Sequence, residues 1–286
     1  MNKTNTEATG AFPKINVIFR SCDVVTAVHH APRPFNLDKL TLIKICFKSL
    51  YDALQGYNYH IVVLGDKISD NLRNFFQQHN VELIEGSFGN DASIRETVKI
   101  AQRFPDDEWV YFCEDDYLHT PDAIKKINTL LQERESIVPA SIKFKRRLRK
   151  REITLLSVPR FINKPDIVVF PADYPDRYEQ AYSARDFIFH TSDSHWRQIS
   201  DVTFTFIMRA GTVKQKAALL NKASHRANDR LLSKKLFGKS FFTINNILGL
   251  SPMPGVATHM HTQTMSPLAD WETIVQKYLN ELGIHA

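Results

Sequence analysis

The sequence predicts an α/β fold in which a mostly parallel sheet is flanked by helices. Short apolar runs of strand length alternate with longer segments whose apolar residues recur at helical spacing. Polar clusters follow directly after the apolar runs of the first half. The chain has 286 residues, of which 43% are hydrophobic, so it can bury one large core, or one core with a smaller lobe.

The first half of the chain alternates strands and helices regularly. The apolar runs predict strands over 15–21, 60–65, 81–84 and 109–113. Helices are expected over 38–54, after Ser69, and after Ser93, where Ser93 and Glu96 form a capping box. Another helix should begin with Pro121 at its first position. Four strands joined by single helices make a Rossmann-like sheet covered on both faces.

The second half is less regular. Strands are expected over 166–170 and 203–209, and helices over 228–237 and 270–282. We expect this half to complete the sheet and to form a C-terminal lobe without a separate domain boundary. Residues 1–14 are expected to be a flexible tail, which leaves a single domain over 15–286.

The charge distribution and the cysteine content narrow the kinds of partner and the cellular compartment to be expected for this protein. The net charge is +6, yet the segment 143–151 alone holds seven cations, and without them the balance is −1 (6 − 7). The three cysteines have neither disulfide nor metal-ligand spacing, and no run approaches the ~20 apolar residues that span a bilayer. The first residues lack the apolar segment of a secretory signal. A cytoplasmic protein is expected.

Four polar clusters are expected at one edge of the sheet. Ligands of open parallel sheets bind outside the carboxyl ends of the strands. That edge should carry 20–23, Asp66, 89–90 and the acidic triplet 114–116. Three consecutive carboxylates repel one another, and a divalent cation bridged by a diphosphate would balance them. The alternative is a solvated turn whose acids cap the next helix.

The triplet also carries a resemblance, in the segment WVYFCEDDYLH. This segment resembles the strand and D-x-D element of GT-A fold glycosyltransferases, especially the inverting, family-2-like branch, and the order of elements is similar over roughly 15–265. The resemblance implies a nucleotide-sugar-binding half over 15–125 and an acceptor-binding half over 126–286. It implies that Asp116 binds a metal directly, while Glu114 and Asp115 hold the ribose, the sugar or the metal's waters. The usual pattern begins with Asp, where this chain has Glu114.

Further donor contacts follow from the same resemblance. The segment from Arg20 to Asp23 looks like the one that lines the nucleoside, and 89–93, which includes Asn90 and Ser93, looks like the third donor loop. Asp66 is similar to the Asp that pairs with the base imide, which favours a UDP-sugar. A simple turn acid is the competing interpretation of Asp66.

An inverting transfer needs a general base to accept the proton of the acceptor hydroxyl. The resemblance implies that this base is Asp229, although Asn228 stands where the family often has an acid. An ordinary acid at a helix N-terminus is the alternative, because the helix dipole favours one there. Asp193 is the second candidate.

A late-loop histidine often completes the metal site in this family, and His259 is the matching residue. Mixed histidine and carboxylate ligation suits Mn²⁺ better than Ca²⁺, so Mn²⁺ or Mg²⁺ is the expected cofactor. Two surface histidines beside a Pro-Gly turn are the alternative. Polar and aromatic clusters that suit a sugar acceptor comprise Tyr174, Arg177, His195, Trp196 and Arg197. Ordinary half-buried structure would also account for them.

The expected function is metal-dependent, inverting transfer of a sugar from a nucleoside-diphosphate donor to a hydroxyl of a surface polysaccharide or lipid-linked glycan. The alternatives are a glycosyltransferase acting on modified bases of phage DNA, and an inactive nucleotide-binding protein. A nucleotidyltransferase is a further alternative, but no Gly-rich loop follows the first strand. The basic run 143–151 would attract an anionic membrane surface or DNA through its charge, or be a solvated loop. A helical turn there would place Phe144 and Leu148 on one edge.

Overall fold

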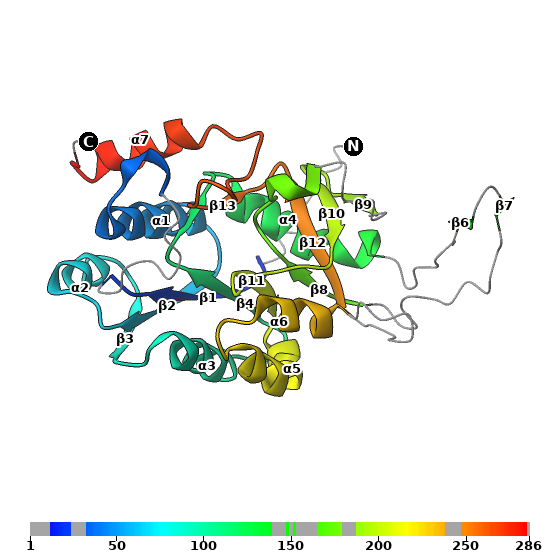
Figure 1. Cartoon of the computed structure of the whole chain (residues 1–286), viewed down its shortest axis with the longest axis horizontal. Helices are drawn as coiled ribbons and strands as arrows, with labels where there is room; N and C mark the ends of the chain where they lie inside the picture. The colour runs from blue at the N-terminus through cyan, green and yellow to red at the C-terminus, as the bar shows by residue number, and fades with distance from the viewer. Residues whose placement is uncertain are drawn as a thin grey trace, which may run out of the picture.

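The computed structural model describes residues 12–23, 33–138, 165–178, 187–237 and 247–284, and the backbone of two short paired strands, β6 (Arg147–Leu148) and β7 (Arg151–Glu152). Its centre is a nine-stranded sheet of order β3-β2-β1-β4-β11-β8-β12-β10-β9 (Figure 1). The strands of this sheet are β1 (Ile15–Ser21), β2 (Tyr59–Asp66), β3 (Glu82–Gly86), β4 (Trp109–Glu114), β8 (Asp166–Val169), β9 (Ile188–His190), β10 (His195–Ile199), β11 (Phe206–Arg209) and β12 (Ile247–Met253).

The strand pairings show that only β10 and β11 run against the other strands of this sheet. The predicted α/β fold with a mostly parallel sheet is therefore confirmed. The order β3-β2-β1-β4 is that of a Rossmann-like half, and the second half of the chain supplies the other five strands. The sheet is thus continuous across both halves.

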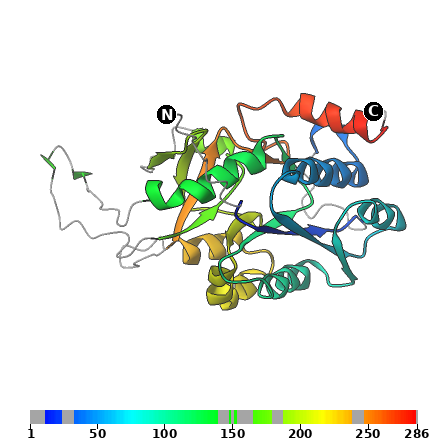
Figure 2. The ribbon, with the colours of Figure 1, turned by 180° about the vertical axis from the view of Figure 1, so that it is seen from behind.

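Helices cover both faces of the sheet (Figures 1 and 2). One layer contains α1 (Lys39–Leu54), α2 (Asp70–Gln77), α4 (Ala123–Ile137) and α7 (Trp271–Glu281), and the other contains α3 (Asn90–Ala101), α5 (Ala210–Ala223) and α6 (Asp229–Leu236). Single-turn helices lie at η1 (Pro34–Asn36) and η2 (Pro175–Tyr178). No helix in the described ranges is long and apolar enough to cross a membrane.

The core fixes the ends of β1 and β4, where the polar clusters lie. Phe19 of β1 is fully buried, and its ring packs edge-on against Phe47 of α1 at a centroid distance of 5.3 Å. Trp109 and Tyr111 of β4 are also buried. Strands buried on both faces are typical of parallel sheets, and they hold the residues that follow them in defined positions.

Two predicted helix starts are wrong. Helix α3 begins at Asn90, and Ser93 lies inside it, donating its hydroxyl to Asn90 O at 2.8 Å. The chain turns at Gly89 with φ +77°, a conformation that glycine adopts without strain, so the helix begins before the capping box. Helix α4 begins at Ala123, and Pro121 lies in the preceding turn, where Ala123 N–H donates to Thr120 O at 3.1 Å.

The side chains of the basic run 143–151 lie outside the described residues. The backbone of Arg147–Leu148 pairs antiparallel with Arg151–Glu152. Leu148 is therefore in an extended strand, and the helical turn considered for this run does not include it. Residues 1–11 of the expected tail also lie outside the described part.

Candidate active site

The acidic triplet lies at the carboxyl end of β4, directly beside the end of β1. Arg20 is the register partner of Glu114, and Ser21 is that of Gly65 on the other side. The polar residues that follow β1, β2 and β4 therefore gather at one edge, as the sequence predicts.

Each carboxylate of the triplet has its own cationic partner. Glu114 Oε1 lies 2.5 Å from Arg20 Nη2. Asp115 Oδ1 lies 2.6 Å from Lys39 Nζ, and Asp116 Oδ2 lies 3.0 Å from His259 Nε2. The protein itself thus supplies counter-charges that the sequence argument attributed to a metal. Lys39 was not among the predicted site residues, because only the packing of α1 against the triplet reveals it.

Arg20 connects several elements at this edge. Besides Glu114, its Nη1 donates to Asn90 Oδ1 at 3.0 Å and to Ser93 Oγ at 3.3 Å. Glu114 also accepts from the hydroxyl of Thr205, which precedes β11, at 3.4 Å. The ends of β1 and β4 and the start of α3 are therefore tied through one guanidinium.

Three of the predicted donor-binding acids hold the backbone of neighbouring loops. Asp115, 8% exposed, accepts Cys22 N–H at 2.9 Å. Asp23 accepts the N–H of Ser69 at 2.9 Å and also its hydroxyl. Asp66, 6% exposed, accepts the N–H groups of Phe88 and Gly89 at 2.7 and 2.8 Å. Because both Asp66 oxygens are used in this way, its contacts are those of a turn acid.

Asp116 and His259 are brought together by a small separate sheet. Strand β5 (Tyr117–His119) pairs antiparallel with β13 (Ala257–His259) and sets His259 opposite Tyr117. The imidazole stacks on the Tyr117 ring at 5.1 Å, and its Nδ1 lies 3.1 Å from Thr264 Oγ1. These contacts fix the orientation of the ring, so Nε2 points at the Asp116 carboxylate.

Asp116 and His259 each stabilise the charged form of the other. Burial favours the neutral form of both groups. For His259 it is outweighed by the Asp116 charge and hydrogen bond, which raise the pKa to about 8. Burial is likewise outweighed at Asp116, where His259 and then Lys39 and Arg20 lower the pKa below its usual value.

The donor set suits a divalent ion that needs its substrate to complete the coordination. Among the described residues, no group of three or more His, Cys, Asp or Glu side chains is placed to hold a metal. Asp116 Oδ1, however, is buried without a hydrogen-bond partner in the described part of the chain, and His259 Nε2 is beside the other oxygen. Mg²⁺ sites commonly use one or two protein ligands together with phosphates and water. Asp116 and His259 fit such a site for Mn²⁺ or Mg²⁺.

Asp229 is the first residue of α6 and is not the residue that caps this helix. The cap is Asn228, whose side chain accepts Leu231 N–H at 2.9 Å. Asp229 Oδ1 is buried and has no hydrogen-bond partner among the described residues. Burial, and then the charge of Glu114, raise the pKa of Asp229 to about 7, against the opposing effects of Arg20 and His259. The Asp229 carboxyl is therefore within electrostatic range of the triplet, and its pKa suits a general base near neutral pH.

Asp193 lies in a different environment. Its two oxygens accept the hydroxyls of Thr129 and Thr191, both at 2.9 Å. After burial, Asp193 is also a cause of the raised pKa of Tyr57, which precedes the amino end of β2. The structure thus brings Asp229, and not Asp193, to the acidic triplet.

The predicted acceptor residues separate into two groups. Tyr174 joins the site through a 2.7 Å hydrogen bond between its hydroxyl and that of Tyr117. Near it, the Arg197 guanidinium lies 4.6 Å from the centroid of the Tyr178 ring and donates to the backbone oxygen of Arg177 at 3.4 Å.

The other two predicted residues do not join Tyr174. Trp196 is fully buried and its indole N–H donates to Thr191 Oγ1 at 3.1 Å, so it belongs to the core and presents no ring face to a ligand. His195 is exposed at the start of β10, between register partners in β9 and β12.

No protein-family model and no curated protein matches the chain. Similar solved structures include a nucleotidyl transferase from Methanothermobacter thermautotroptrophicus, with 11% identity, a TM-score of 0.44, and coverage of 95% of this chain and 100% of that one. The galactosyltransferase LgtC, in complex with donor and acceptor sugar analogues, is 9% identical with a TM-score of 0.40, covering 82% of this chain and 72% of that one. TarS 1-349 of S. aureus is 12% identical with a TM-score of 0.41, covering 83% of this chain and 60% of that one. At such identities and TM-scores these likenesses assign no activity, which has to come from the residues of the site.

Proposed function

We propose that this chain is a GT-A-type glycosyltransferase that moves a sugar from a nucleoside-diphosphate donor to a hydroxyl acceptor with inversion. The observation that carries the proposal is Asp229, a largely buried carboxyl near the acidic triplet with a pKa of about 7. Such a group is half ionised at neutral pH and can accept a proton there.

The donor diphosphate would lie against the triplet and its cations. Arg20 and Lys39 carry permanent positive charge at this edge, and both are partly exposed, with 18% and 22% of their side chains accessible. Asp116 and His259 would hold Mn²⁺ or Mg²⁺ together with the donor phosphates. The ion would neutralise charge on the leaving diphosphate. Arg20 and Lys39 would orient the donor and offset part of the same charge.

Asp229 would act on the acceptor. Its carboxylate accepts the proton of the acceptor hydroxyl while that oxygen forms a bond to the anomeric carbon. The bond between the anomeric carbon and the phosphate oxygen breaks, and the nucleoside diphosphate leaves with the electron pair. Attack from the face opposite the leaving group inverts the configuration, and protonated Asp229 returns its proton to solvent.

The same residue favours glycosyl over nucleotidyl transfer. A nucleotidyltransferase that joins a sugar phosphate to a nucleotide uses a phosphate oxygen as nucleophile, which is already ionised at neutral pH and needs no base. A hydroxyl acceptor has to lose a proton, and Asp229 supplies the group for that step. The absence of glycine between Cys22 and Leu54 agrees with this preference, because a phosphate-cradling loop after β1 would require one.

The acceptor is proposed to be a glycan, free or lipid-linked. Tyr178, 46% exposed, ends the single-turn helix η2 that directly follows Tyr174. An exposed aromatic ring covers the apolar face of a sugar. A DNA acceptor would depend on the basic run 143–151, whose side chains are outside the described part.

Calorimetric titration of nucleoside diphosphates tests the donor site. A panel of UDP, GDP, CDP and ADP, each with and without Mn²⁺, identifies the nucleotide that binds. We expect Asp116→Asn to reduce the Mn²⁺-dependent affinity by on the order of 10²-fold, because a metal ligand is lost while a rim position leaves the core intact. Asp107→Asn, an exposed acid in the loop before β4, is the matched control and should bind as wild type does.

Two results of this titration would change the roles assigned to the residues of the donor site. Unchanged affinity in Asp116→Asn would remove this residue from the metal site. Equal nucleotide affinity with and without metal in the wild type would leave Arg20 and Lys39 as the groups that hold the diphosphate.

A further inference from the structure

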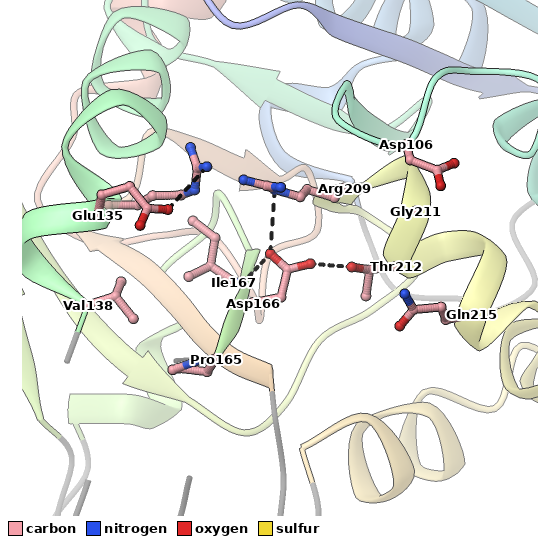
Figure 3. Close-up of a pocket in the computed structure, with 11 residues that line it drawn as sticks. Asp106, Glu135, Val138, Pro165, Asp166, Ile167, Arg209, Gly211, Thr212 and Gln215 are labelled. Carbon is pink, nitrogen blue, oxygen red and sulfur yellow. Dashed lines mark hydrogen bonds and ion pairs between the residues drawn. The ribbon is translucent and has the colours of Figure 1, made fainter. Parts of the chain in front are cut away.

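A cavity of about 400 Å³ lies at the edge of the sheet opposite the candidate active site (Figure 3). Trp109, the first residue of β4, is paired with Arg209 at this edge, whereas Glu114 ends β4 at the candidate active site. Five residue steps of a strand separate the two edges by roughly 17 Å. The cavity is open to solvent on one side and is lined by the end of α4, the start of β8, the end of β11 and the start of α5.

Arg209 is a cation with few partners in this cavity. Its guanidinium lies 5.5 Å from the centroid of the Trp109 ring, and its Nε is 3.9 Å from Asp166 Oδ1, beyond hydrogen-bond distance. Nε is buried and has no hydrogen-bond partner among the described residues. Figure 3 shows the side chain reaching from β11 towards the side of the cavity that carries Glu135. A guanidinium has five N–H donors, so Arg209 retains donors for a ligand.

Arg134 of α4 brings a second guanidinium to the same place. It lies 5.5 Å from the centroid of the same Trp109 ring, and its Nη1 donates to Leu131 O at 2.7 Å. Burial, and then the positive charge of Arg209, lower the pKa of Arg134, against the opposing charges of Glu135 and Asp166. Two neighbouring guanidiniums supply ten N–H donors, more than the acids beside them accept, and an anion with several oxygens can use the remainder.

The acids of the cavity wall have partners of their own, and for Glu135 that partner is Arg134. Asp106 pairs with Lys214 at 2.5 Å, and Glu135 lies 3.3 Å from Arg134. The two oxygens of Asp166 accept the Thr212 hydroxyl and, at 2.9 Å, the N–H of Ile167. None of these carboxylates forms a hydrogen bond with Arg209, so the donors of Arg209 are not satisfied by the wall.

We propose that this cavity binds a small metabolite through a phosphate group held by Arg209 and Arg134. A cavity of this size accommodates a small molecule. A guanidinium bonds a phosphate through two parallel N–H donors, and Glu135 and Asp166 offset the charge of the two arginines without accepting a hydrogen bond from Arg209. The exposed amide of Gln215 at the rim can bond the remainder of the ligand. This site is independent of the proposed transferase activity, and it stands whether or not that activity is correct.

Thermal unfolding in inorganic phosphate, at constant ionic strength set with NaCl, tests the proposal. The wild type should be stabilised in a saturable manner, by roughly 3 °C at ten times the Kd. Arg209→Met removes the guanidinium but keeps a linear apolar stem, and should abolish the saturable shift. Arg103→Met removes the same charge from an exposed arginine that pairs with Glu82, and should leave the shift intact. Asp116→Asn should also leave it intact, since the active-site edge is not involved.

Four results would overturn the proposal: no saturable shift in the wild type, an undiminished shift in Arg209→Met, loss of the shift in Asp116→Asn, or an equal shift in acetate. The last of these would assign a carboxylate ligand instead. Arg134→Met is the second variant if Arg209→Met does not fold by circular dichroism. It should weaken phosphate binding by at least tenfold, and wild-type affinity in it would equally contradict the paired-arginine site.

Discussion

The two ends of β4 carry charge in different ways. At the carboxyl end, each acid of the triplet has a cationic partner at 2.5 to 3.0 Å, whereas Asp229 has no ion pair among the described residues and its Oδ1 is buried there without a hydrogen-bond partner. At the amino end, the acids of the cavity pair with Lys214, Thr212 or Arg134, and within the described ranges Arg209 has a single ion pair, at 3.9 Å. Paired charges fix the geometry of each edge, while the under-partnered group at each edge is the one that can act on a ligand.

The two under-partnered groups avoid the cost of a buried charge by different means. A carboxyl can bind a proton, and the raised pKa of Asp229 reflects that response. An arginine cannot lose its charge in a protein. Arg209 instead stacks on Trp109 and keeps 32% of its side chain exposed. Asp229 is therefore suited to accept a proton, and Arg209 is suited to bind an anion.

The largest effect is expected for turnover in Asp229→Asn. The rate should fall on the order of 10²- to 10⁴-fold while donor affinity is unchanged, because a base acts on the acceptor proton in the transition state. In the wild type, turnover should rise with pH through about 7 as Asp229 ionises. Initial rates with saturating donor, beside nucleotide titrations, check both statements. Asp193→Asn is the matched control, and a rate loss there with none in Asp229→Asn would move the base to Asp193.

A somewhat smaller effect is expected for the stability of the same variant. The folded-state pKa of Asp229 is raised above its unfolded value, so the stabilisation it brings is present below about pH 4 and is lost as pH rises through about 7. Relative to Asp229→Asn, the nucleotide-free wild type should lose up to about 4 kcal/mol of unfolding free energy between pH 4 and pH 8.5. Urea unfolding of both proteins across this range measures the difference. Parallel pH profiles would mean that Asp229 is fully solvated.

The smallest effects compare the two edges directly. Arg20→Met should cost about 1–3 kcal/mol of stability, because it leaves the half-buried Glu114 without its cation. Arg209→Met should change stability by less than about 1 kcal/mol, since a stacking contact is lost and the repulsion with Arg134 is relieved. Denaturant midpoints of the two variants, each compared with that of the wild type, give the two losses of stability. Equal losses would show that the two arginines are equally partnered, and the contrast between the edges would disappear.

The strands of the first half, and the edge of the sheet at which their polar clusters gather, could be predicted from the sequence. An apolar run such as 15–21 predicts a strand through its own composition, and parallel order places the next residues at a common edge. Helix starts were less predictable. The capping box at Ser93 has the right residue types, but the preceding Gly89 turn, held by Asp66, begins the helix earlier.

By itself the sequence determined the alternation of strands and helices and the position of three acids after β4, because these depend on residues close together in the chain. Only the tertiary structure decided what each acid does. Lys39 is 76 positions from Asp115, and His259 is 143 positions from Asp116. Burial and the charge of Glu114, 115 positions away in the chain (229 − 114), raise the pKa of Asp229. Desolvation and ion pairing arise from side chains that meet only when the chain folds, and local periodicity carries no information about which of them will meet.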